Sequence, residues 1–354
     1  MESNEAFKLG RSLLVPCVQE LAKKPITTIP SRYLVPDQEN QVVSDVGSMG
    51  AEIPVIDMQA LVSKESMDSE LAKLDFACKD WGFFQLINHG VSLSLVEKLK
   101  TEIQDFFNLP MEEKKKYWQT PGEVEGFGQA FVVSEEQKLD WADMFFLATL
   151  PPHSRKPHLF PNLPLPFRET LDHYSLELEK LTMAIVVQIA KAINMKVEEM
   201  REFFEGGLQT MRMNYYPPCG EPDKVIGLTP HSDGSGITIL LQVNEVEGLQ
   251  VKKDGKWIPV KPLPNAFIVN IGDTVEIITN GACRSIEHRA TINSEKERLS
   301  IATFCNPKGE IGPAPSLISQ GQTALFRKVR VEDYLKSMFE RELHEKSHLD
   351  SVRI

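Results

Sequence analysis

Six short runs of β-prone residues fill the stretch between Gln209 and Cys305, and turn residues separate one run from the next. They cover residues 210–216, 237–243, 249–251, 266–271, 289–293 and 300–305. Five or six strands of this length within roughly 100 residues are typical of a double-sheet barrel or a jelly roll. Alternating βαβ units are disfavoured, because they need a helix between consecutive strands. The stretch therefore predicts a β core.

The chain on either side of this stretch favours helices. Apolar residues recur at helical spacing through residues 167–194, which predicts a long, buried scaffold helix. Shorter helices are expected over residues 12–23, 66–80, 93–107 and 331–346, and single strands over 53–57 and 81–87. Residues 122–166 are rich in Gly, Pro and aromatic residues and are interpreted as an irregular functional loop.

These patterns predict a mixed α/β protein in which N-terminal and C-terminal helices support the β core. We expect four regions: an N-terminal helix, arm and polar linker at 1–52, a mostly helical region at 53–205, the β core at 206–308 and a helical tail at 309–354. The tail is expected to pack on the same unit as the core.

Composition and charge narrow the class of protein. Hydrophobic residues make up 42% and charged residues 25% of the chain, as in soluble globular proteins. The formal charge of −11 disfavours non-specific attraction to nucleic acid or to an anionic membrane. No apolar run approaches the roughly 20 residues that span a bilayer, and residues 1–11 lack the apolar core of a signal peptide.

The cysteines point to a reducing compartment. There are five, an odd number, widely spread and without a CxxC motif, which fits free thiols better than a disulfide framework. We therefore expect a cytoplasmic protein. A monomer is expected as well, because no exposed apolar helix requires a partner.

His231 and Asp233 are candidate metal ligands, because residues two apart in an extended chain point to the same face. Pro230 before them and Gly234 after Asp233 place the pair where a strand meets a turn. His288, on a distant β-prone run, supplies a second imidazole, and three ligands on one face leave three octahedral positions open. This arrangement is typical of non-haem Fe(II) oxygenases. For the H-x-D pair alone, the alternative is a surface turn.

Arg298 and Ser300 form a second candidate site by the same spacing argument. A planar guanidinium binds a carboxylate through two hydrogen bonds, and a neighbouring hydroxyl adds a third. The alternative is a strand arginine in a surface ion pair with Glu295 or Glu297. Tyr216 could also donate a hydrogen bond to an acid, although a core aromatic is the default for a single tyrosine.

The segments that carry these residues form one combination of motifs. The motifs are WGFFQLINHG (81–90), MNYYPPC (213–219), PHSDGSGITILLQ (230–242), GLQV (248–251), NAFIVNIGD (265–273), HRATIN (288–293) and RLSIATF (298–304). Together they resemble the plant 2-oxoglutarate/Fe(II)-dependent dioxygenases, and the resemblance covers nearly all of the chain.

This resemblance implies a double-stranded β-helix, a distorted jelly roll, in which His231, Asp233 and His288 bind Fe(II). It implies that Arg298 and Ser300 bind the distal carboxylate of the cosubstrate 2-oxoglutarate, with Tyr216 and Asn214 beside them. The implied reaction consumes O2, converts 2-oxoglutarate to succinate and CO2, oxidises a C–H bond of a small aromatic molecule, and is stimulated by ascorbate.

Within the family, the chain is most similar to plant alkaloid O-demethylases acting on thebaine and codeine and to senescence-related oxidoreductases. The similar segments include residues 134–151, 155–171 and 209–219. This predicts oxidation of a methoxy carbon and release of formaldehyde. The alternative is flavonoid hydroxylation or desaturation, as in the more distant flavonol and anthocyanidin synthases.

The resemblance also implies a substrate pocket between the 122–147 loop and the strands near Arg212 and Ser300. Aromatic substrates favour aromatic walls; the candidates are Phe127, Phe131, Phe145, Arg212 and Phe304, and the alternative for each phenylalanine is ordinary core packing. The sequence Gly-Ser-Gly at 234–236 is smaller than the Ala-containing version typical of the family, which would change the space near the metal.

Three other functions are considered. An oxidase of the same fold without 2-oxoglutarate is disfavoured by the Arg298-x-Ser300 pair. A non-catalytic binding protein is disfavoured by the complete ligand set. A zinc hydrolase is disfavoured because no glutamate lies at the helical spacing of such sites.

Overall fold

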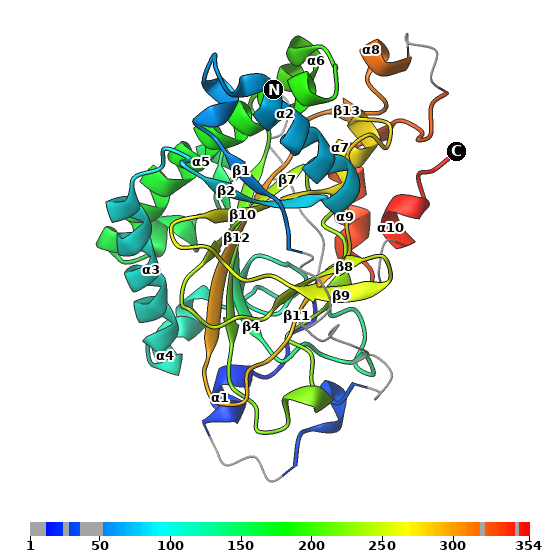
Figure 1. Cartoon of the computed structure of the whole chain (residues 1–354). Coiled ribbons are helices and arrows are strands. Elements are labelled where there is room, and N and C mark those ends of the chain that lie inside the picture. The colour runs from blue at the N-terminus through cyan, green and yellow to red at the C-terminus, as the bar shows by residue number, and fades with distance from the viewer. Residues whose placement is uncertain (1–11, 24–27, 36–51, 319–322, 344–346) are drawn as a thin grey trace, which may run out of the picture.

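The computed structural model describes residues 12–23, 28–35, 52–318, 323–343 and 347–354. A large and a small β-sheet form its core, and helices surround them (Figure 1). The order of the eight-stranded sheet is β1-β2-β10-β7-β12-β5-β4-β3, and that of the four-stranded sheet is β6-β11-β8-β9. This is the expected mixed α/β architecture with a double-stranded β-helix at its centre.

The large sheet contains β1 (Val55–Asp57), β2 (Phe83–Ile87), β3 (Gly126–Gly128), β4 (Asp143–Leu150), β5 (Gln209–Tyr216), β7 (Ile237–Gln242), β10 (Phe267–Ile271) and β12 (Arg298–Cys305). The small sheet contains β6 (Leu228–His231), β8 (Leu249–Lys253), β9 (Lys256–Pro259) and β11 (His288–Ala290). A separate pair consists of β13 (Glu310–Ile311) and β14 (Val329–Arg330). Strands β1–β4 lie outside the predicted core region of 206–308, yet they belong to the same sheet as its strands.

The longest helix, α5 (Leu165–Ala192), confirms the scaffold helix expected from the apolar spacing. It packs on β4 and β12 and contacts three other helices, α2 (Met67–Phe76), α3 (Leu93–Asn108) and α6 (Val197–Phe204). The remaining helices are α1 (Val18–Ala22), α4 (Met111–Lys114), α7 (Asp273–Ile278), α8 (Pro315–Ile318), α9 (Val331–Phe339) and α10 (Ser347–Asp350), and a π-helical turn, Ala77–Trp81, follows α2.

Two strands of the large sheet, β3 and β4, contradict the sequence interpretation, and β4 is the longer of the two. Strand β4 lies within the segment 122–166, for which an irregular loop is expected, and all eight of its residues are buried. A strand covered on both faces carries a nearly continuous apolar run, here residues 144–148, so it lacks the alternation that identifies a half-buried strand. The sequence patterns likewise do not predict β9, α6 or α7.

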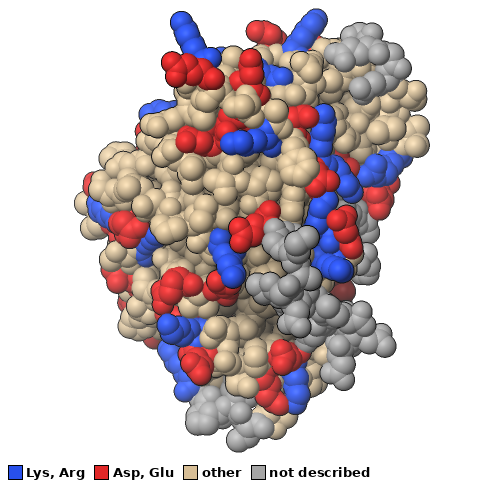
Figure 2. Space-filling view, viewed as in Figure 1, with Lys and Arg blue, Asp and Glu red and all other residues tan. Residues whose placement is uncertain are grey.

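Other expectations have a simpler outcome. The five cysteines are buried free thiols, as expected. The linker expected at 37–51 lies outside the described residues, and so do residues 344–346 of the helix expected over 331–346. Helix α9 ends at Phe339. In the part of the chain that is described, no helix has the length and apolar character to cross a membrane. The face shown in Figure 2 carries acidic and basic side chains side by side.

Candidate metal centre and active site

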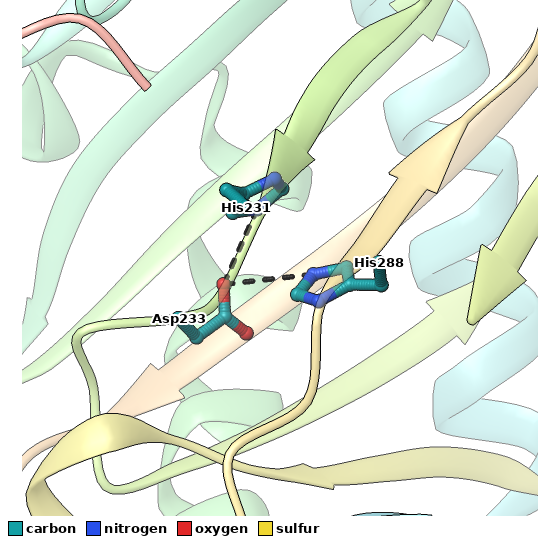
Figure 3. Close-up of side chains that lie close together, drawn as sticks. All are labelled: His231, Asp233 and His288. Carbon is teal, nitrogen blue, oxygen red and sulfur yellow. Dashed lines mark ion pairs between the residues drawn. The ribbon is translucent and has the colours of Figure 1, made fainter. Parts of the chain in front are cut away.

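Two neighbouring strands of the small sheet bring the predicted histidines together. His231 ends β6, His288 begins β11, and the antiparallel register pairs the two residues directly. Directly opposed side chains share one face of a sheet, and the two imidazole centroids are 4.3 Å apart. Figure 3 shows both rings near the carboxylate of Asp233, which follows β6.

Asp233 completes the group. Its Oδ1 lies 3.5 Å from His231 Nε2 and 3.7 Å from His288 Nε2. Its other oxygen, Oδ2, accepts hydrogen bonds from Thr238 Oγ1 at 2.6 Å and from Asn270 Nδ2 at 2.8 Å. The protein therefore holds one carboxylate oxygen and leaves the other facing the two imidazoles.

The loop that carries Asp233 is itself held by the start of α7. The backbone N–H of Asp273 donates to the Asp233 carbonyl at 2.7 Å, and that of Gly272 donates to the Gly236 carbonyl at 2.8 Å. A Cβ atom on Gly272 would overlap the Ser235 carbonyl, so glycine is needed for this close approach. The ligand loop is thus fixed by backbone contacts.

Backbone carbonyls orient both imidazoles. His231 Nδ1 lies 2.8 Å from the Thr229 carbonyl oxygen, and His288 Nδ1 lies 3.2 Å from that of Ile286. A carbonyl only accepts hydrogen bonds, so each Nδ1 carries a proton and Nε2 is the ring atom left to bind a metal. Burial and the neighbouring His231 lower the pKa of His288 to about 4. This ring is therefore neutral near pH 7, the form that binds metals.

The carboxylate is ionised. Burial by itself raises the pKa of Asp233, but His288, His231 and the Thr238 hydroxyl outweigh it and hold the pKa well below its usual range. One ligand atom from each of the three residues lies within 4.8 Å of the others. Two imidazoles and a carboxylate are the donor set of non-haem Fe(II) sites. The residues fit the metal that the sequence predicts.

Polar side chains lie along the paired strands β5 and β12, next to the three metal ligands. The register places Arg298 opposite Tyr216 and Ser300 opposite Asn214. Arg298 is only 2% exposed, its Nη2 donates to Gln242 Oε1 at 2.9 Å, and its Cζ lies 5.1 Å from the centroid of the Tyr216 ring. These side chains line one cavity with the metal ligands.

The Arg298 guanidinium forms no ion pair with any described residue. Glu297, considered above as its surface partner, instead accepts hydrogen bonds from Tyr215 and Gln104. Burial lowers the pKa of Arg298, although Tyr216 opposes this. A buried cation without a carboxylate is costly, so this position suits an anionic ligand.

Two cavities meet at the metal ligands. The polar cavity, about 520 Å³, contains Arg298 and its neighbours, and the aromatic cavity, about 540 Å³, lies on the other side. Four residues line both: His231, Asp233, Arg212 and Phe304. Arg212 is 8% exposed, its guanidinium has no hydrogen bond or ion pair among the described residues, and its Nε is buried without a partner.

Known proteins match the chain over its whole length. Residues 207–307 match the 2OG-Fe(II) oxygenase superfamily, and residues 53–164 match the N-terminal region of the non-haem dioxygenase in morphine synthesis. Protein SRG1 of Arabidopsis thaliana is 60% identical over 348 residues, 97% of each chain. The chain belongs to the plant 2-oxoglutarate/Fe(II)-dependent oxygenases. It is therefore an oxidoreductase with Fe(II) as cofactor, held by His231, Asp233 and His288, and 2-oxoglutarate as cosubstrate.

Two relatives in this oxygenase family carry the name of a reaction. Oxoglutarate-dependent flavonoid 7-O-demethylase 1 of Ocimum basilicum is 54% identical over 353 residues, 99% of this chain and 94% of the relative. Codeine O-demethylase of Papaver somniferum is 53% identical over 365 residues, the whole of both chains. The crystal structure of JOX2 in complex with 2OG, Fe and JA has 36% identity and a TM-score of 0.85, covering 96% of this chain and 98% of that one.

The predicted pocket residues of this oxygenase divide between the cavity and the core. Phe131, Arg212 and Phe304 line the aromatic cavity. Phe127 and Phe145 do not, which corrects the prediction for these two: they pair across β3 and β4 with their rings in the core, and Phe145 stacks on Phe106 at 4.7 Å. Successive side chains of a strand point to opposite faces, so the neighbours Met144 and Phe146 face the cavity instead.

The sequence interpretation also missed one wall of the aromatic cavity. Helix α9 contributes Leu335, Met338 and Phe339. Their helical spacing predicts an apolar face but does not say what the face covers. Asn270 and Thr238, which hold Asp233, lie in the motifs of residues 265–273 and 230–242, but nothing in those motifs shows that their side chains reach the carboxylate.

Proposed function

We propose that this oxygenase removes the methyl group of a methoxylated aromatic small molecule, most specifically an alkaloid. Two relatives of 53% and 54% identity, matched over 94% or more of each chain, are named O-demethylases, although one name refers to an alkaloid and the other to flavonoids. The proposal rests on the fact that both names give the same reaction, O-demethylation, for substrates with different ring systems. The aromatic cavity beside the metal ligands suits such a substrate.

In this proposal the polar cavity binds 2-oxoglutarate. Arg298 donates to the distal carboxylate and Ser300 adds a hydroxyl, while Tyr216 and Asn214 lie on the facing strand. The supporting observation is that the Arg298 guanidinium is buried and has no carboxylate partner among the described residues. A bound dicarboxylate would offset the cost of burying that charge.

On the substrate side, Arg212 donates to an oxygen of the substrate, and Phe131 and Phe304 contact its rings. Arg212 lies between the two cavities with its guanidinium free of protein partners in the described part of the chain. Burial raises the pKa of the nearby Asp140, which two hydrogen bonds from Thr229 and the positive charge of Arg212 oppose. Thr229 thus satisfies the Asp140 carboxylate by hydrogen bonding, and the Arg212 guanidinium stays available for the ligand.

Bound Fe(II) supplies the oxidising chemistry, with O2 as oxidant and 2-oxoglutarate as the source of two electrons. The chain contributes orientation, because Arg298 and Arg212 hold the two organic molecules on either side of His231 and Asp233. It also excludes water, because aromatic and aliphatic side chains surround the reacting carbon. The products are succinate, CO2, a phenol or alcohol, and formaldehyde from the collapsing hemiacetal.

The proposal is tested with the Fe(II)-loaded protein, 2-oxoglutarate, O2 and a panel of methoxylated alkaloids and flavonoids, including thebaine and a methoxyflavone. Succinate and formaldehyde are measured together. Equal amounts of both, dependent on one probe, are expected. Absence of succinate with every probe would contradict the proposal.

A second candidate is hydroxylation or desaturation of a flavonoid without demethylation. The observation that favours a flavonoid is the 54% identity to a flavonoid-specific relative. The same assay separates the two candidates, because flavonoid-dependent succinate without formaldehyde would support the second. We further propose that the working form is a cytoplasmic monomer, which size-exclusion chromatography with light scattering would test for the oligomeric state.

A further inference from the structure

Helix α9 lies against the loop that carries the metal ligand Asp233. Met338 packs on Gly234, the next residue after this ligand. A Cβ atom on Gly234 would overlap the Met338 Sδ atom and lie 3.6 Å from Tyr334 Cε1. The absence of a side chain at position 234 therefore leaves the room that the Met338 thioether occupies beside the ligand loop.

Aromatic stacking joins the end of α9 to the opposite side of the cavity. The Phe339 ring stacks on Phe131, with centroids 4.7 Å apart and 9° between the planes, and lies 5.8 Å from Phe146. Phe131 has a φ of 63°, a left-handed conformation that is strained for a bulky residue. Strain of this kind persists only where surrounding contacts hold it. The stack therefore holds Phe131 and Phe339 in place on the two facing walls of the aromatic cavity.

A hydrogen bond anchors α9 to the same ligand loop. The Tyr334 hydroxyl donates to Asp273 Oδ2 at 2.8 Å, and the backbone N–H of Asp273 donates to the Asp233 carbonyl at 2.7 Å. On its other side, Tyr334 contacts α10, where the His348 ring is 4.2 Å away. Figure 1 shows α9 beside α7 and α10. Asp273 and Tyr334 thus form a hydrogen-bonded link between the ligand loop and the helix.

We propose that helix α9 determines the size of the substrate, because Met338, seated on Gly234, limits the space above the metal centre. Met338 is thus a specificity-determining residue, and Tyr334 is a positioning residue that keeps the helix in place. This inference rests on the proposed function, which requires the substrate to occupy the aromatic cavity.

The test compares Gly234→Ala, Met338→Ala and the double variant with methoxynaphthalene as a small probe and thebaine as a large one. In Gly234→Ala the added methyl group displaces the Met338 thioether into the cavity. We expect kcat/KM to fall about tenfold more for thebaine than for methoxynaphthalene. In the double variant the displaced group is absent, and thebaine turnover should return to within about threefold of Met338→Ala.

Gly220→Ala is the matched control, because a Cβ atom there would meet nothing within 4 Å. Fe(II) affinity is measured for every variant and should not change. An equal loss with both probes, or a double variant no better than Gly234→Ala, would overturn the inference, because the methyl group would then act on the ligand loop itself.

Binding of the same probes provides a readout that does not depend on turnover. Quenching of protein fluorescence is measured without O2, with Fe(II) and 2-oxoglutarate present. Met338→Ala should strengthen the binding of thebaine relative to that of methoxynaphthalene. An unchanged order of the two affinities would overturn the inference. If the wild-type enzyme consumes 2-oxoglutarate with neither probe nor the wider panel, the proposed function fails, while this ranking still decides the role of α9.

Tyr334→Phe tests the anchor. Loss of one hydrogen bond should raise KM for the large probe by about threefold to tenfold and leave kcat nearly unchanged. Asp273→Asn keeps an acceptor for the Tyr334 hydroxyl and should behave like the wild type. A fall in kcat with an unchanged KM would remove Tyr334 from the positioning role.

Discussion

The metal end and the substrate end of the active site are built from the chain in different ways. At the metal end, His231 faces His288 across one pair of strands, and Arg298 faces Tyr216 across another, so backbone hydrogen bonds fix their separations. At the substrate end, the α9 side chains of residues 335–339 meet the side chains of β4 and β12 by packing, without a shared strand register. Strand register tolerates little change, whereas packed side chains can change size. We therefore expect the first end to set the reaction and the second to select the substrate.

Removing a metal ligand is the most severe test of this comparison. Asp233→Ala and His231→Ala should each lower kcat/KM by about a thousandfold or more, because the metal contributes several kcal/mol to the reaction. Succinate formation, bound iron and circular dichroism are measured, with the exposed His153→Ala as control. Turnover that persists in both variants would contradict the assignment of the ligands.

Arg298→Ala should raise KM for 2-oxoglutarate by about a hundredfold, because it removes the charged partner from a buried pair. The KM of Arg298→Lys for 2-oxoglutarate should lie between those of the wild type and Arg298→Ala, since lysine keeps the charge but lacks the planar guanidinium. Initial rates are measured against 2-oxoglutarate concentration, and Arg201→Ala, exposed on α6, is the control. An unchanged KM would exclude Arg298 from cosubstrate binding.

Weakening the support of Asp233 should have a smaller effect. Asn270→Ala and Thr238→Val each remove one hydrogen bond to Asp233 Oδ2, and we expect Fe(II) to bind about thirtyfold more weakly. Titration with Fe(II) measures this, and excess Fe(II) should restore most of the rate. Thr238→Ser keeps the hydroxyl and serves as control; if it behaves like Thr238→Val, the hydrogen bond is not the cause.

The smallest effect on activity is expected at the substrate end, and it compares two phenylalanines. Phe304→Ala should change the preference among methoxylated probes by about tenfold, more than it changes uncoupled 2-oxoglutarate consumption. Phe145→Ala should leave the preference unchanged and lower the free energy of unfolding by about 3–5 kcal/mol, because its ring lies in the core. Substrate panels and thermal unfolding are measured for both. The reverse pattern would exchange their assignments.

Much of the metal end is predictable from the sequence. Residues two apart on a strand share a face, so the position of Arg298 beside Ser300 follows from local geometry. The H-x-D spacing identifies the other pair, although Asp233 lies past the end of β6. The β-prone runs identify most strands of the core. The substrate end is harder to predict from the sequence. Strand β4 is buried on both faces, so its pattern identifies neither the strand nor the face that Phe145 or Phe146 occupies.

The sequence by itself determined the family, the metal triad and the alternation that aims Arg298 and Ser300 at one cavity. The alternation of Arg298 and Ser300 is local, because it depends on one strand, whereas His288 reaches His231 only through the pairing of β6 with β11. Tertiary structure alone decided that Phe145 lies in the core and that α9 packs on Gly234. Which face of β4 meets the cavity depends on its pairing with β5, and the contact of Met338 joins segments about a hundred residues apart, where packing and not local conformation sets the distance.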